Sequence, residues 1–228
     1  MRKESECFRG RRRHGLAALL TAAVVVLSLP IAWRGAVAAA APKKKGEQKE
    51  TDPRFIPKGP NLVPNGDFSK GTTYPEHWEP LPPNVEWGDD KEYPEHGKVI
   101  HFKVPREVAR TTGLKYWCDY IEVKPNQSYT MSFDCRKTGG VSLKVFIRGY
   151  GEYKGSRRMI YDTPVSVYGD GPEWIRYGRS KPFTTAVPGG MKVQWIRFML
   201  YAYGGGEGEA WWDNVHMEEV SSAPEKDL

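Results

Sequence analysis

The sequence has little cysteine, and it has almost no net charge outside its first 41 residues. It contains three cysteines in 228 residues, and two of them, Cys118 and Cys135, lie beyond residue 41. Seven of the 34 basic residues and two of the 28 acidic residues lie in residues 1–41, which leaves 27 basic and 26 acidic residues elsewhere. The net charge of +6 therefore belongs mainly to the N-terminus, and it does not indicate a partner among nucleic acids.

The sequence also lacks the common motifs of catalysis. It has no nucleophile elbow, no phosphate-binding loop and no zinc-protease motif, and His77 and His96 follow glutamates without the helical spacing of a zinc site. One acidic cluster is expected to lie in a loop, with no strand to orient it: Glu86, Asp89, Asp90 and Glu92. We therefore expect a protein without enzymatic activity. A glycan-active hydrolase with a dispersed pair of carboxylates is the less favoured alternative.

The N-terminal 41 residues have the organisation of a signal peptide. Three arginines at 11–13 precede an apolar stretch of about 15 residues at 15–29, and small residues follow at 36–41. Cleavage is expected after one of residues 38–41. The alternative is an uncleaved anchor held by its arginines, for which the apolar stretch is short. Both alternatives predict that the rest of the protein is exported, to an extracellular, periplasmic or cell-surface location.

The exported part is expected to hold one folded domain. Residues 42–60 are charged, rich in lysine and proline and poor in hydrophobic residues, which predicts a disordered linker. Residues 221–228 form a polar tail. Between them, residues 61–220 show repeated strand patterns and no amphipathic helix of useful length, which predicts an all-β domain of the β-sandwich or jelly-roll type.

The strand patterns also predict which side chains face the core. The expected strands, separated by turns such as Gly139-Gly140, are 98–104, 116–123, 129–136, 141–148, 173–177, 183–185, 194–203 and 210–220. Residues 149–158 are predicted to be a loop. A disulfide between Cys118 and Cys135 is permitted by export, but the alternation along their strands argues against it.

Motifs at both ends of residues 61–220 resemble a known family. The domain opens with Asn-Leu-Val-Pro-Asn-Gly-Asp-Phe-Ser at 61–69, followed by Pro-Glu-His-Trp at 75–78. It closes with Trp-Trp-Asp-Asn-Val-His-Met-Glu at 211–218. In order and spacing these motifs resemble the carbohydrate-binding modules of the CenC-like group, families four and nine and their relatives, which have a galactose-binding-like β-sandwich. The resemblance implies a structural role for Trp78.

The resemblance also implies a structural calcium ion, because members of the group commonly hold one between their first and last strands. The matching positions are Gly66, Gly97 and Asp213, and Asp67 is a further candidate ligand near the opening motif. Backbone carbonyls beside carboxylates are suitable calcium ligands. This sequence departs from the family at Ser69, where a glutamate is usual. The alternative is that Asp213 caps a turn or pairs with a nearby base.

Strand alternation places aromatic and basic side chains on an outer face of the sandwich. If residues 141, 143, 145 and 147 and residues 196, 198, 200 and 202 face the core, their neighbours face outward. The outward candidates for glycan binding are Phe146, Arg148, Tyr150, Trp195, Arg197, Tyr201 and Tyr203. Weaker candidates are Tyr116, Trp117 and Tyr120. The alternative is that the N-terminal segment or the region 150–172 covers these rings.

These observations together predict an exported, noncatalytic module that binds a polysaccharide or other glycan through this outward face. The alternative is a protein-binding or structural module of the cell envelope on the same fold. A membrane is a partner only if the N-terminal segment is retained.

Overall fold

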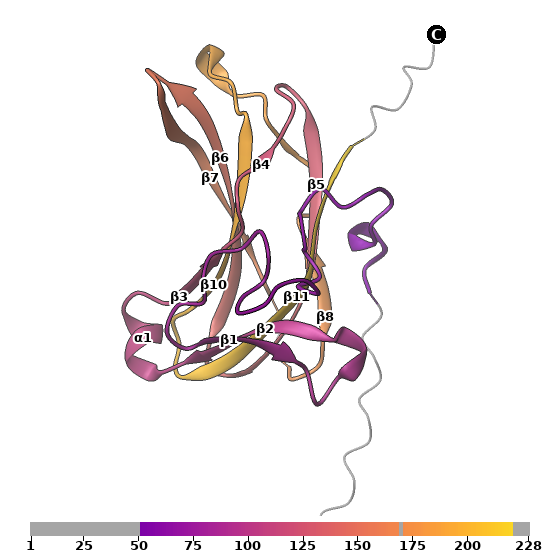
Figure 1. Cartoon of the computed structure of the whole chain (residues 1–228), viewed down its shortest axis with the longest axis vertical. Coiled ribbons are helices and arrows are strands. Elements are labelled where there is room, and N and C mark those ends of the chain that lie inside the picture. The colour runs from indigo at the N-terminus through magenta and orange to yellow at the C-terminus, as the bar shows by residue number, and fades with distance from the viewer. Residues whose placement is uncertain (1–50, 169–170, 221–228) are drawn as a thin grey trace, which may run out of the picture. The chain divides into compact units, whose positions relative to one another are not determined.

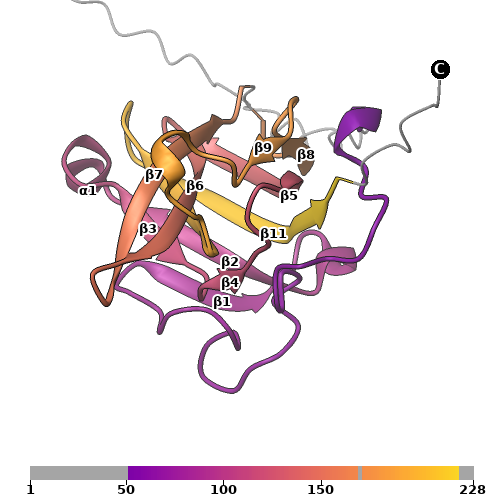
Figure 2. The same ribbon diagram turned by 90° about the horizontal axis from the view of Figure 1, so that it is seen from above.

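The computed structural model describes residues 51–168 and 171–220, which form two antiparallel β-sheets packed against each other (Figures 1 and 2). The first sheet has the strand order β1–β2–β11–β5–β8, with β9 also paired to β5, and the second has the order β3–β10–β6–β7, with β4 paired to β10. The predicted β-sandwich is confirmed. The predicted signal peptide and the polar tail lie outside the described residues.

The strands of the first sheet are β1 (Val85–Asp89), β2 (Lys98–Val104), β5 (Ser128–Gly139), β8 (Ile175–Gly178), β9 (Phe183–Thr184) and β11 (Gly208–Glu219). Those of the second are β3 (Leu114–Trp117), β4 (Ile121–Glu122), β6 (Ser142–Tyr153), β7 (Ser156–Ser166) and β10 (Trp195–Tyr203). The helical segments are α1 (Arg106–Arg110) and the 3-10 turns η1 (Pro53–Phe55), η2 (Pro94–His96) and η3 (Pro188–Gly190). In the described part of the chain, no helix has the length and apolar character needed to cross a membrane.

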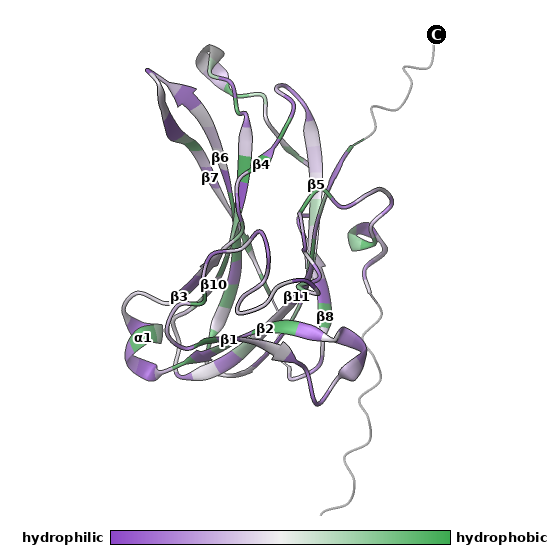
Figure 3. Ribbon diagram, viewed as in Figure 1, coloured by the Kyte–Doolittle hydropathy of each residue, from purple (hydrophilic) through white to green (hydrophobic). Residues whose placement is uncertain are grey.

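The core lies between the sheets and follows the predicted alternation. Alternate residues are buried along β6 and along most of β10. Figure 3 shows hydrophobic and hydrophilic residues mixed along the strands of the sandwich. On the first sheet, Trp212 of β11 and Phe133 of β5 are fully buried and contact each other with ring centroids 5.8 Å apart. Trp78 is also buried and packs on Phe68 and Tyr116, as expected for a structural tryptophan.

The prediction that residues 149–158 form a loop is wrong. Strands β6 and β7 continue through this region as a hairpin, with Lys154 and Gly155 at its turn. Both turn residues have positive φ, 50° and 71°, as a tight two-residue hairpin turn requires. Strand β7 was missed because it is an edge strand with a mainly polar sequence, which hides its alternation. The hairpin therefore extends the second sheet.

Two other expectations differ from the structure. The single strand expected at 116–123 is interrupted between β3 and β4, where Cys118 bridges to Trp78 and Tyr120 lies exposed in the gap. Residues 51–60 belong to the predicted disordered linker, yet they contact the first sheet. Phe55 stacks on Tyr177 of β8 with a centroid separation of 6.4 Å. Composition does not predict this contact, because the partner residues lie more than a hundred positions away.

Candidate functional site

The outer side of the second sheet carries a continuous layer of aromatic and basic side chains. Strands β6 and β10 are paired so that Phe146 lies opposite Met199, Arg148 opposite Arg197, and Tyr150 opposite Trp195. Since paired residues share a side of the sheet, the structure brings together all seven residues predicted for glycan binding. We call the layer the aromatic face; it consists of Trp117, Tyr120, Lys144, Phe146, Arg148, Tyr150, Arg157, Trp195, Arg197, Met199, Tyr201 and Tyr203.

At the end of the aromatic face nearest the β6–β7 turn, a guanidinium group lies between two rings. Arg157 of β7 lies 4.0 Å from the ring centroid of Tyr120 and 4.3 Å from that of Trp195. Tyr120 also meets Tyr150 edge-on at 5.0 Å. Burial raises the pKa of Tyr150, so its hydroxyl remains a hydrogen-bond donor well above neutral pH.

In the middle of the face, two arginines lie on one tryptophan. The guanidinium groups of Arg148 and Arg197 lie 4.7 and 5.0 Å from the ring centroid of Trp117 on β3. Each arginine is also held by a carboxylate, because Arg148 pairs with Asp162 at 3.0 Å and Arg197 pairs with Glu79. These contacts fix the guanidinium groups, so their remaining N–H donors are oriented before any ligand arrives.

At the other end, the face is formed by tyrosines. Tyr201 meets the edge of Phe146 at 5.7 Å and stacks on Tyr203 at 5.0 Å with nearly parallel rings. The Tyr201 hydroxyl donates a hydrogen bond to the carbonyl of Thr112. The Lys144 ammonium lies 4.5 Å from the Tyr203 ring centroid. From Trp195 to Tyr203 the stripe follows nine residues of β10, about 26 Å of extended strand.

The described chain does not cover the aromatic face. Residues 51–60 lie on the first sheet, and the β6–β7 hairpin adds to the second sheet instead of folding over it. Most members of the face are half-buried, Tyr120 is 37% exposed, and Met199 is buried. In Figure 1 the second sheet curves toward its outer side at both ends, with the β6–β7 turn and α1 leaning the same way. The face is therefore the inside of a curved surface with rings and donors, an arrangement suited to sugars.

Sequence reasoning underweighted two central members of the face. Trp117 and Tyr120 were weaker candidates, because the irregular stretch after Trp117 breaks the alternation that would assign them. The pairing of Trp117 with Met199 of β10 places the indole beside the predicted residues. The third weaker candidate, Tyr116, is fully buried in the core and does not belong to the face.

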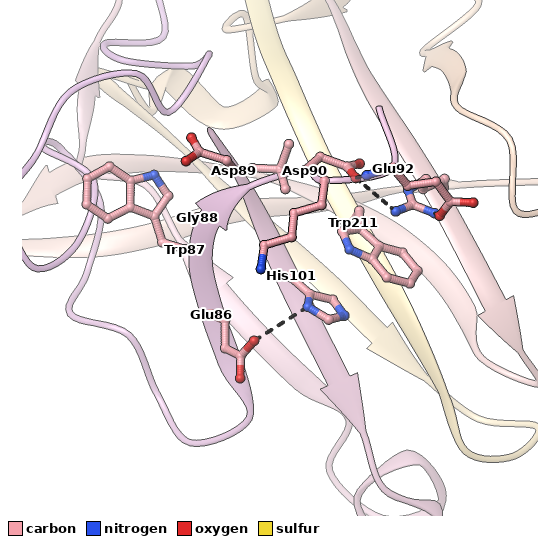
Figure 4. Close-up of a pocket in the computed structure, with 11 residues that line it drawn as sticks. Glu86, Trp87, Gly88, Asp89, Asp90, Glu92, His101 and Trp211 are labelled. Atoms are coloured by element: carbon pink, nitrogen blue, oxygen red, sulfur yellow. Dashed lines mark hydrogen bonds and ion pairs between the residues drawn. The ribbon is translucent and has the colours of Figure 1, made fainter. Parts of the chain in front are cut away.

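The opposite sheet has a polar pocket of about 290 Å³ (Figure 4). In it, His101 stacks on Trp211 at 4.4 Å, and the Arg136 guanidinium lies 3.9 Å from the Trp211 ring centroid. The His101 side chain lies between two carboxylates, with its Nε2 2.6 Å from Glu209 and its Nδ1 3.6 Å from Glu86. Aromatic and charged groups therefore form a second stacked row on this sheet.

The acidic cluster lines this pocket and is not confined to a loop, which corrects the prediction. Glu86 and Asp89 lie on β1, while Asp90 and Glu92 follow it and pair with Arg136 at 3.2 and 2.7 Å. A hydrogen bond from Lys103 lowers the pKa of Glu86. A glycosidase needs a general acid whose pKa is raised. The carboxylates of Glu86, Asp90 and Glu92 are therefore held in ion pairs, an arrangement that does not favour the hydrolase alternative.

Each of the four residues predicted to hold calcium has a hydrogen-bond partner within the described residues. The Asp67 side chain is bonded to Ser69, while the carbonyls of Gly66 and Gly97 accept hydrogen bonds from backbone amides. Asp213 is buried and accepts hydrogen bonds from His96 at 2.7 Å and from Asn214.

Burial raises the pKa of Asp213 to about 6, against the lowering effect of those hydrogen bonds. Among the described residues, no group of three or more histidine, cysteine, aspartate or glutamate side chains is arranged to hold a metal ion. The predicted site also relies on backbone carbonyls, which such a group does not include, and calcium binding stays a prediction.

The two cysteines beyond the N-terminal segment are both free thiols buried in the core. Burial raises the pKa of Cys118 to about 12 and raises that of Cys135 as well. The histidines that follow glutamates are also apart: His77 lies near Asp119, whereas His96 stacks on Trp174 at 4.0 Å. Neither observation points to catalysis or to a disulfide.

No protein-family model matches the chain, and no curated protein matches it in sequence. Among solved structures it is similar to the Family 16 Carbohydrate Binding Module-2, with a TM-score of 0.50 and 15% identity over 70% of this chain and 100% of that one. The fold is carbohydrate-binding-module-like. The module TmCBM61, solved in complex with beta-1,4-galactotriose, gives a TM-score of 0.45 and 13% identity over 71% of this chain and 99% of that chain.

Tailspike protein 4 of bacteriophage CBA120 gives a TM-score of 0.49 and 14% identity, over 70% of this chain and 21% of that protein. At such low identity, the first of these similarities shows the β-sandwich fold alone. The argument for function therefore rests on the side chains of this chain.

Proposed function

We propose that this protein is an exported, noncatalytic glycan-binding module, and that the aromatic face is its binding surface. The observation that carries the proposal is the stripe of rings and fixed guanidinium groups on the curved outer side of the second sheet. Sugar rings present flat C–H surfaces that pack on aromatic side chains, and their hydroxyls accept hydrogen bonds from guanidinium groups. A sheet face exposed only to water would need neither feature.

The test is binding of the full chain to a glycan array and to insoluble polysaccharides in a pull-down assay. Trp195→Ala and Tyr201→Ala each remove one ring, one toward either end of the stripe. Each variant is expected to weaken binding about ten-fold, since an aromatic ring packed against a ligand commonly contributes over 1 kcal/mol. Tyr168→Ala is the control, because Tyr168 is 77% exposed, follows β7 and is not part of the aromatic face.

The outcomes separate the candidate functions. Loss of binding in both ring variants, with Tyr168→Ala unchanged, supports the module and its face. Retained binding in both ring variants places the site elsewhere. Absence of binding to every glycan by a folded protein refutes the proposal and favours a protein-binding role at the cell envelope.

Calcium is tested in the same samples by thermal unfolding with excess calcium and with a chelator. Calcium that binds only the native state raises the unfolding temperature, by an amount that grows with the logarithm of the calcium concentration once this exceeds the Kd. An unfolding temperature that is the same in both conditions contradicts the predicted calcium site.

A further inference from the structure

The charged residues of the aromatic face are arranged in rows across the second sheet. Residues that are directly opposite on neighbouring strands share one row, so the pairing of β3, β10, β6 and β7 defines each row. The central row holds Arg197, Arg148 and Asp162. Its two arginines are matched by two carboxylates, Asp162 and Glu79. This row is electrically balanced without a ligand.

The row of Tyr201 is not balanced. Tyr201 lies opposite Lys115 of β3 on one side and opposite Lys144 of β6 on the other, and Ser166 ends the row on β7. The two lysine positions are two strand spacings apart, about 10 Å. Neither lysine makes an ion pair or a hydrogen bond within residues 51–168 and 171–220; the contact of Lys144 is with the Tyr203 ring.

The face is also asymmetric along the strands. Within the described part of the chain, Glu122 and Glu152 are carboxylates of this face without an ion pair. Both lie at the other end of the face, where Glu122 is paired with Trp195 and Glu152 with Arg157. The end formed by Tyr201 and Tyr203 therefore carries uncompensated positive charge beside aromatic rings. A lysine ammonium is a compact point charge with three donors, and carboxylate and sulfate groups are its natural partners.

We infer that the glycan bound by the aromatic face is anionic, a polymer whose sugars carry carboxylate or sulfate groups, and that Lys115 and Lys144 bind those groups on either side of Tyr201. This inference rests on the proposed function and narrows its ligand class. The Tyr201 ring is fixed by its hydroxyl bond to Thr112, so it provides the sugar platform while the lysines supply the charge recognition. The paired arginines of the central row remain donors to hydroxyl groups.

The experiment compares polymers that differ in charge alone. Polygalacturonate is paired with its methyl ester, and dextran sulfate is paired with dextran, with binding of the full chain measured in 0.1 M and 1 M NaCl. The first pair tests recognition of carboxylate and the second tests recognition of sulfate. At least one charged polymer is expected to bind ten-fold or more tightly than its neutral partner. Binding should weaken at 1 M salt, where the screening length falls from about 10 Å to 3 Å.

The variants Lys115→Gln and Lys144→Gln remove one charge each from the row. Each is expected to weaken binding to the charged polymer about three- to five-fold, and the double variant about ten-fold or more, with smaller salt dependence. Lys98→Gln is the matched control, because the Lys98 ammonium also lies 4.5 Å from a ring centroid, that of Trp87, but on the opposite sheet. All variants share the basic N-terminal residues, so differences between them isolate the two lysines. Thermal unfolding confirms that each variant is folded.

Each outcome decides between the inference and the proposed function. The inference is overturned if neutral and charged polymers bind equally well, or if neutral glycans bind and both charged polymers do not. Either result leaves the proposed function standing. Equal losses in Lys98→Gln and in the Lys115 and Lys144 variants overturn the assigned site. A folded protein that binds no glycan, charged or neutral, refutes both.

Discussion

Arg136 offers a sharp test of how the first sheet is held together. Its side chain is 3% exposed, and its guanidinium donates to Asp90 at 3.2 Å and to Glu92 at 2.7 Å while lying on Trp211. The Asp90 side chain is 2% exposed, so Arg136→Met would leave a buried carboxylate without its cation. Breaking a buried ion pair in this way costs about 3–5 kcal/mol.

The structure narrows that range. Asp90 keeps hydrogen bonds from the Glu92 and Tyr93 amides and from the Trp174 indole, which favours the lower end. The lost contact with Trp211 adds about 1 kcal/mol. The bond to Glu92 adds little, because the Glu92 side chain is 63% exposed. We therefore expect Arg136→Met to lower the free energy of unfolding by about 3–4 kcal/mol.

The assay is equilibrium unfolding in urea at pH 7, with Arg148→Met as the matched control. Arg148 also pairs with an aspartate and lies on a tryptophan, but its side chain is 25% exposed, so its loss should cost about 1 kcal/mol or less. Adding Asp90→Asn to Arg136→Met should recover part of the loss, because no unpaired charge then remains buried. Equal costs for the two arginines, or a double variant less stable than Arg136→Met, would refute this reasoning.

Three further results are expected. Burial opposes ionisation of Glu218, but the Gly59 and Lys58 amides and His216 outweigh this effect, so the pKa of Glu218 is lowered. The stability that the Glu218 carboxylate contributes is therefore present above pH 5 and is lost as the pH falls through that lowered pKa. At pH 7 the Glu218→Gln variant should therefore be about 1–2 kcal/mol less stable than the wild type and should unfold at a lower temperature. This difference in stability should disappear in acid, and a difference that grows in acid would contradict the reasoning. The buried thiols of Cys118 and Cys135 should resist iodoacetamide at pH 8 until urea unfolds the chain, and mass spectrometry showing a disulfide between them would disprove the assignment. Gly149→Ala should lower the free energy of unfolding by about 1–3 kcal/mol, because a Cβ there would lie 2.3 Å from the Tyr161 ring. Adding Tyr161→Leu to Gly149→Ala should restore part of that stability, and stability losses that simply add would argue against this contact.

The sequence was informative wherever one strand alternates strictly between a core side and an outer side. Strand β2 has its predicted bounds, and the alternation along β6 and β10 correctly assigned every outward aromatic residue of both strands. This succeeds because a buried face fixes the register of a strand, and a slip of one residue would expose every core side chain. The binding role of those outward residues stays a prediction, which the Trp195→Ala and Tyr201→Ala variants test.

Prediction failed where structure depends on partners distant in the sequence. Strand β1 was missed because its five residues include two acids and a glycine, and it becomes a strand by pairing with β2. The position of Trp117 depends on its pairing with β10, which no local pattern contains. Calcium binding stays a prediction, but Asp213 shows why a local pattern cannot name a partner: its carboxylate accepts a hydrogen bond from His96, 117 residues away.

Contacts between the start of the domain and β11 bring the two ends of the domain close together. The Leu62 amide donates to the Met217 carbonyl, and the Gly59 amide donates to Glu218, so the chain enters beside the place where it leaves. Both points lie on the first sheet. A fusion made at residue 51 or at residue 220 would therefore join the domain at its first sheet, whereas the aromatic face belongs to the second.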